Sequence, residues 1–148
     1  MLLTVFTQFT LIVSFIAIFC LEISANEKLR VSGDILYYST DDAKEELDQE
    51  ITWDDAESFE AILKENRNIN LLQLNSTGGE IEAAMHLADV IIDYELDTHI
   101  DGECSSACVL MFLGGEKRSL ARGSWIGFHK SSWASNFIKD YYVEWKDH

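Results

Sequence analysis

The sequence predicts an α/β domain built around a largely parallel sheet. Short apolar segments with the character of buried strands alternate with longer segments in which apolar residues recur at helical spacing, and glycines mark several junctions between them. Apolar residues make up 47% of the chain and charged residues 25%, which is typical of a folded globular protein. The order strand, helix, strand, helix, strand at these intervals requires right-handed parallel crossovers.

The length of the chain limits its domain organisation, and its net charge limits the binding partners it can have. The 148 residues suffice for one domain together with a targeting segment. Lys and Arg number 11 against 26 Asp and Glu, giving a formal net charge of −15. A chain this acidic repels phosphate backbones and anionic head groups, so no nucleic-acid partner is expected.

Residues 1–25 form a separate compositional unit. They carry one charge, Glu22, and the run Phe9–Leu21 is apolar apart from two hydroxyl residues. This run is shorter than the ~20 residues that span a bilayer and suits a signal peptide, with Ala25 at the cleavage point. No Lys or Arg precedes the run, and extending it from Leu2 would give an uncleaved anchor. We therefore expect a signal peptide or an N-terminal membrane anchor on a domain of residues 26–148. That domain would be exported to the cell envelope, periplasmic or tethered to the inner membrane, with membrane contact only through the N-terminal segment.

The first elements of the domain follow from turn and cap signals. Leu29–Tyr38 is strand-like with a turn at Ser32–Asp34, and Asp41–Glu50 is predicted to be a solvated acidic loop. Thr52 with the acidic residues after it predicts a helix start, and Asn66–Asn68 its end. The apolar stripe of this helix is Phe59, Ile62 and Leu63.

The second half continues the alternation. Ile69–Leu74 is predicted to be a buried strand that enters the loop Asn75–Gly79, and a helix follows. The predicted core face of that helix is Ile81, Ala84, Met85, Ala88, Ile91 and Ile92. Asp97–Ile100 is the next strand, and a third helix is predicted to begin within Gly102–Ser106 and to carry Val109–Leu113, with Gly114 and Gly115 ending it.

The last elements are a strand over Gly123–His129 and an aromatic helix over Ser135–Trp145. The stripe of this helix is predicted to pack on the domain, with an exposed docking face as the alternative. Its members are Phe137, Ile138, Tyr141, Tyr142 and Trp145.

Two cysteines, Cys104 and Cys108, fall in the mature domain, and Cys20 falls in the N-terminal segment. After export, Cys104 and Cys108 meet an oxidising compartment, where they could pair, and a separation of one helical turn is marginally compatible with a disulfide. The alternative is two small buried apolar side chains. No His/Cys pair with ligand spacing accompanies them, so no metal site is predicted.

Two strand-to-helix junctions carry the candidate chemistry. Gly78 and Gly79 supply backbone amides that can turn toward a developing oxyanion. Ser106 precedes an apolar helix, either as an N-cap or as a nucleophile whose following amide, that of Ala107, completes an oxyanion hole. His129 ends an apolar strand, whereas the other histidines, His86, His99 and His148, are interpreted as structural.

The order and spacing of Gly79, Ser106 and His129 resemble the Clp protease proteolytic subunit and the wider ClpP/crotonase fold. The segments Cys104–Cys108, Phe112–Gly115 and Gly127–His129 are still more similar to exported ClpP-like proteins of bacterial envelopes. The resemblance covers roughly residues 69–130. It implies parallel-sheet crossovers of ββα units, incomplete at the C-terminus.

This resemblance implies a serine peptidase. Ser106 falls on the family's nucleophile and His129 on its general base, with Gly78, Gly79 and Ala107 as the oxyanion hole. Peptides or unfolded proteins would be the substrates, a homo-oligomer is expected, and no cofactor is needed.

Two departures weaken the expected activity. Thr77 stands where the family loop usually has proline, and the family's triad acid lies well downstream of the histidine, on a portion absent from this chain. Asp140 is the available substitute, alongside Asp147. A slow or inactive hydrolase is therefore expected. The alternatives are a non-catalytic peptide-binding module, or truncated relative, and a crotonase-type acyl-thioester enzyme.

Overall fold

The computed structural model describes residues 26–128. The N-terminal segment, the predicted helix Ser135–Trp145, His129 and Asp140 lie outside the described residues.

The described chain forms one six-stranded mixed sheet that is mostly parallel. The strands are β1 (Leu29–Ser32), β2 (Ile35–Ser39), β3 (Leu71–Ser76), β4 (Asp97–Ser105), β5 (Arg118–Leu120) and β6 (Trp125–Gly127). Their order is β1-β2-β3-β4-β5, and β6 pairs with the far end of β4. Only the β1–β2 hairpin is antiparallel. This arrangement confirms the predicted α/β class.

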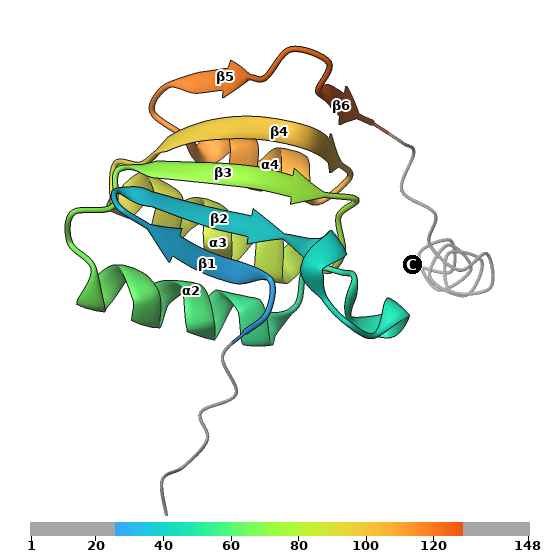
Figure 1. Ribbon diagram of the computed structural model, residues 1–148, viewed down its shortest axis with the longest axis horizontal. Helices are drawn as coiled ribbons and strands as arrows, with labels where there is room; N and C mark the ends of the chain where they lie inside the picture. Colours follow the sequence, from blue (N-terminus) through green and yellow to red (C-terminus); the bar gives the residue numbers. More distant parts are fainter. Residues whose placement is uncertain (1–25, 129–148) are drawn as a thin grey trace, which may run out of the picture.

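Three helices cover one face of the sheet (Figure 1): α2 (Trp53–Glu65), α3 (Ile81–Asp93) and α4 (Cys108–Gly114). Alternate residues of the strands face them and form the core. Burying such side chains stabilises the fold by roughly 1.5–3 kcal/mol each. The fully buried members from the sheet include Leu36, Leu72, Leu74 and Ile100. No helix in residues 26–128 is long and apolar enough to cross a membrane.

The hairpin and the first helix follow the prediction. Gly33, at the turn between β1 and β2, has a φ of +65°, which glycine adopts without steric cost. Thr52 is the N-cap residue of α2, and its N–H donates to Asp55 Oδ2 at 2.9 Å. Two short 3-10 helices, η1 (Thr40–Asp42) and η2 (Glu46–Asp48), lie in the acidic loop.

The predicted boundary between the third strand and the third helix is wrong. β4 continues to Ser105, so Gly102–Ser105 belong to the strand, and α4 begins at Cys108. The register between β3 and β4 shifts at this point, and Asn75 Oδ1 accepts the Glu103 N–H at 3.0 Å. Because the Asn75 side chain replaces a ladder bond, the strand continues through the segment in which the third helix was predicted to begin.

The predicted core face of α3 is also partly wrong. Ile81, Met85 and Ile92 are 49%, 55% and 57% exposed, whereas Leu87 and Val90, outside the predicted face, are buried. This helix is apolar around most of its circumference, so periodicity alone does not single out the packed side. The edge strand β5, whose residues are all exposed, was not predicted.

Candidate active site

Ser106 lies in a sharp turn between β4 and α4. Its φ of +53° is in the left-handed region, which residues other than glycine rarely adopt. Its N–H donates to the Gly127 carbonyl oxygen at 3.0 Å, so β6 holds the turn in place. A strained serine between a strand and a helix is the local geometry in which nucleophilic serines are presented.

The Gly78–Gly79 turn packs directly against Ser106. A methyl group on Gly78 would lie 2.8 Å from Ser106 Cβ and 3.1 Å from the Ala107 nitrogen. A methyl group on Gly79 would lie 2.2 Å from the Ile51 nitrogen. Both glycines have positive φ, +113° and +150°, so no other residue fits here without displacing backbone.

The three backbone amides predicted for the oxyanion hole differ in how they are used. The Gly78 N–H donates to Ser76 Oγ at 3.1 Å. Within residues 26–128, the N–H groups of Gly79 and Ala107 have no hydrogen-bond acceptor. The amide of Ala107, which follows Ser106 in the chain, and the amide of Gly79, in the turn whose Gly78 contacts Ser106, are thus available within the described residues to stabilise negative charge on a bound carbonyl oxygen.

A disulfide joins Cys104 and Cys108 on either side of Ser106. Cys104 lies in β4 and Cys108 is the first residue of α4, with their Cα atoms 5.3 Å apart. Both residues are fully buried. The bond therefore bridges the strand and the helix across the strained turn, rather than one turn within a helix.

His129 and Asp140 lie outside the described residues, so their positions relative to Ser106 are not part of this geometry. The strand that precedes His129 in the sequence is β6, which runs parallel to β4 (Figure 1). In this pairing Gly127 lies opposite Ser105. His129 is the second residue after Gly127 in the chain.

The other described histidines have structural partners. His99 Nδ1 lies 2.8 Å from Ser119 Oγ, an exposed pair between β4 and β5. His86 contacts Glu60 at 2.9 Å and packs against Trp53. Hydrogen bonds from Lys64 and then His86 lower the pKa of the Glu60 carboxyl.

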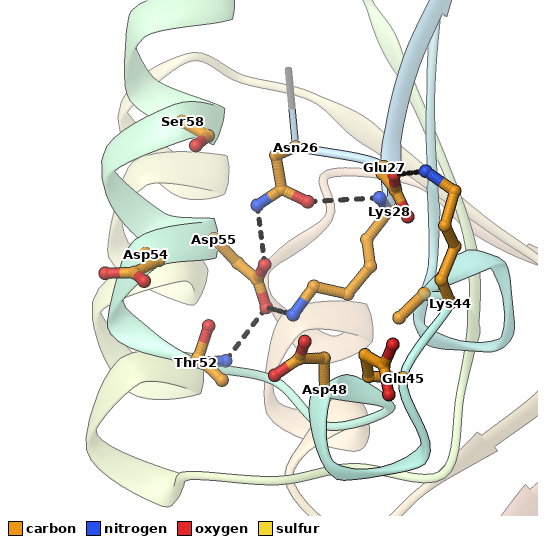
Figure 2. A pocket seen from close by; sticks show the side chains of 11 residues that line it. Asn26, Glu27, Lys28, Lys44, Glu45, Asp48, Thr52, Asp54, Asp55 and Ser58 are labelled. Atoms are coloured by element: carbon orange, nitrogen blue, oxygen red, sulfur yellow. Dashed lines mark hydrogen bonds and ion pairs between the residues drawn. The ribbon is translucent and has the colours of Figure 1, made fainter. Parts of the chain in front are cut away.

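A second polar cluster, at the start of α2, was not predicted. It borders a surface cavity of about 480 Å³ (Figure 2). Asp55 lies at its base, fully buried, and its Oδ2 is 2.7 Å from Lys28 Nζ. Tyr38 donates to the same oxygen at 2.8 Å, and Asn26 donates to Oδ1 at 2.7 Å.

The bonds of Asp55 connect α2 to β2, through Tyr38, and to the segment just before β1, through Asn26 and Lys28. Every buried side-chain polar atom in the described part of the chain has a hydrogen-bond partner, this cluster included. Burial, followed by the charge of Asp55, raises the pKa of Tyr38 far above its ordinary value. Residues 26–128 contain no cluster of metal-ligating side chains. The cluster thus joins elements of the fold, and its only sequence signal was Asp55 at the third position of a helix.

Comparisons with known proteins show the fold class. A ClpP1 mutant from Listeria monocytogenes superposes with a TM-score of 0.53 at 20% identity, over 64% of this chain and 60% of that one. The ClpP protease catalytic domain from Plasmodium falciparum gives 0.50 at 22% identity, over 61% and 55%. A protein assigned as an enoyl-CoA hydratase, from Streptomyces coelicolor A3(2), gives 0.49 at 10% identity, over 70% and 48%.

The described part of the chain therefore has a fold similar to that of ClpP, as the sequence had suggested. The matched region spans 60% or less of the length of each of these proteins. No family model and no curated protein matches the sequence.

Proposed function

We propose that this protein is a Clp-type serine hydrolase of the cell envelope that cleaves peptides slowly. The observation that carries the proposal is Ser106 in its strained turn, followed by the Ala107 amide and contacted by the Gly78–Gly79 turn. This geometry is what acyl transfer needs at a nucleophile. The ClpP-like fold supports peptides as the substrate class.

His129 is the proposed general base. Ser106 Oγ would bond to the scissile carbonyl carbon while its proton passes to His129, and the two amides would hold the oxyanion. The C–N bond then breaks as His129 returns the proton to the leaving amine. A water molecule, giving a proton to His129, attacks the acyl-serine and releases the acid, and Ser106 regains its proton.

Chain connectivity supports this choice of base. Gly127 is bonded to Ser106 through its carbonyl oxygen, and His129 is two residues further along. Two residues of chain span at most about 7 Å. The described histidines His86 and His99 are instead engaged with Glu60 and Ser119.

Labelling by a phosphonofluoridate probe tests the proposal. Ser106 Oγ should displace fluoride from phosphorus, and peptide mapping should place the adduct on Ser106. Ser106→Ala should abolish the adduct. Ser119→Ala is the matched control, because Ser119 also contacts a histidine but lies mid-strand, and it should label normally. Failure of the well-folded protein to label would contradict the proposal.

Two other functions would give different results in binding, labelling and turnover experiments. A non-catalytic peptide-binding module would bind peptides without cleaving them or labelling. A crotonase-type enzyme would turn over acyl-thioesters in the Ser106→Ala variant, because it needs only the amides. A homo-oligomer and export by the N-terminal segment remain part of the proposal, and fractionation with N-terminal sequencing of the mature protein tests export.

A further inference from the structure

The acidic loop, residues 41–50, is attached at both of its ends to the Gly78–Gly79 turn. Ile51, which follows the loop, is fully buried, and its N–H donates to the Gly78 carbonyl oxygen at 2.8 Å. Thr40, which precedes the loop, is also fully buried, and its Oγ1 donates to Ser76 Oγ at 3.2 Å. Segments far from the turn in the sequence therefore determine how it is held.

The bond from Ile51 sets the direction of the Gly79 amide. Every peptide bond in residues 26–128 is trans, and a trans peptide unit points its C=O and its N–H in opposite directions. Because the Gly78 carbonyl is bonded to Ile51, the Gly79 N–H of the same peptide unit points away from Ile51. This N–H is the one that lacks an acceptor within the described residues, so it is available as a donor.

Ser76 holds the preceding peptide unit of the turn. The Gly78 N–H donates to Ser76 Oγ at 3.1 Å, and Ser76 is 1% exposed. A buried N–H that loses its acceptor is costly, so this bond favours one orientation of the unit. A hydroxyl oxygen has two acceptor sites, and those of Ser76 are used by the Gly78 N–H and the Thr40 hydroxyl. Thr40 thus restricts the rotamer of Ser76.

We propose that Thr40, acting through Ser76 Oγ, positions the Gly79 amide to receive an oxyanion. This inference rests on the proposed function, in which that amide stabilises the tetrahedral intermediate. The Thr40 hydroxyl holds the Ser76 hydroxyl, the Ser76 oxygen holds the Gly78 N–H, and the next peptide unit presents the Gly79 N–H. Thr40 and Ser76 are therefore positioning residues, which act without touching the substrate.

Thr98 offers a matched control. It is also a fully buried threonine, and its Oγ1 donates to the Phe112 carbonyl oxygen at 2.8 Å. Thr98→Val and Thr40→Val each remove one buried hydroxyl and keep the shape of the side chain. A general loss of stability should appear in both variants, whereas loss of positioning should appear only in Thr40→Val.

The rate of phosphonofluoridate labelling of Ser106 in the full chain tests the inference, because the phosphoryl oxygen takes the place of the oxyanion. Thr40→Val should label about tenfold more slowly, and Ser76→Ala about a hundredfold more slowly, because a displaced donor loses much of its effect. Thr40→Ser keeps the hydroxyl and should label within about twofold of wild type. Thr98→Val should label at the wild-type rate. Equal rates in Thr40→Val and Thr98→Val, or a Thr40→Ser variant as slow as Thr40→Val, would overturn the inference.

NMR with isotope-labelled glycine separates this inference from the proposed function, because it observes the turn without any reaction. The Gly78 N–H should exchange with solvent faster in Thr40→Val than in wild type and in Thr98→Val, and the Gly79 signal should shift. If wild-type protein does not label but these changes occur, the proposed function fails and the role of Thr40 in holding the turn stands. If wild-type protein labels at a rate that Thr40→Val leaves unchanged, the positioning role fails and the hydrolase proposal stands.

Discussion

Gly78 and Ser106 approach so closely that a single methyl group on Gly78 would lie 2.8 Å from Ser106 Cβ. The two residues come from different strand-to-helix junctions, separated along the chain by the whole of α3 and β4. The parallel sheet brings the two junctions together, because the carboxyl ends of neighbouring parallel strands lie at one edge. The nucleophile candidate and the glycine turn are thus parts of one packed unit.

Gly78→Ala should therefore damage both stability and labelling. The positive φ and the close contacts should lower the free energy of unfolding by about 2–4 kcal/mol, measured by urea denaturation. Gly123→Ala is the control, because Gly123 has a φ of +95° but nothing within 4 Å of the added methyl group. Its cost should be only about 1–2 kcal/mol, with normal labelling. Equal costs in the two variants would show that packing against Ser106 is unimportant.

The disulfide should matter more to the site than to the fold. The loop closed by Cys104 and Cys108 is short, so reduction should lower the free energy of unfolding by at most about 2 kcal/mol. Ser106 labelling should slow on reduction, because the strained turn loses its bridge. A Cys104→Ala/Cys108→Ala variant should not respond to reductant. Alkylation of both thiols in unfolded, unreduced protein from the envelope would refute the disulfide.

Asp55 should be among the most sensitive positions in the fold. Asp55→Ala would leave Lys28 buried without its counter-ion and remove the acceptor of Tyr38, costing about 3–5 kcal/mol in urea denaturation. Lys44→Met is the control, because it removes the exposed Lys44–Glu27 pair at the same cavity and should cost about 0–1 kcal/mol. Similar losses in the two variants would contradict a stabilising role for the buried pair.

Tyr38 should make the protein sensitive to alkali. Its pKa is raised by burial in the folded state, so above the ordinary value of about 10 the unfolded chain loses this proton while the folded one keeps it. Stability is then present below pH 10 and falls above it, by up to about 1.4 kcal/mol per pH unit. Tyr38→Phe should flatten this decline, whereas Tyr37→Phe should not. A decline that persists unchanged in Tyr38→Phe would contradict the assignment.

Local patterns sufficed for much of the fold. The turn signal before Ile35, the cap at Thr52 and the buried strand ending near Asn75 each depend on neighbouring residues, so the sequence alone predicted them. The glycines and the serine of the site were also found from sequence, because strand-to-helix junctions have their own signatures. The parallel order of the strands, also predicted, brings the two strand-to-helix junctions to the same edge of the sheet.

Other features depended on contacts between distant segments. The extension of β4 depends on the hydrogen bond between the Asn75 side chain and the Glu103 N–H. The buried face of α3 is the one that packs against α2, α4 and the sheet. The Lys28–Asp55 pair joins residues far apart in sequence. The apolar arc of α3 is wider than the face that packs, so the pattern does not mark its limits, and a buried charge finds its partner only when the chain is packed. The sequence therefore determined most of the elements and the nucleophile candidate, whereas tertiary packing decided the extent of β4, the strained turn at Ser106 and the Lys28–Asp55 pair.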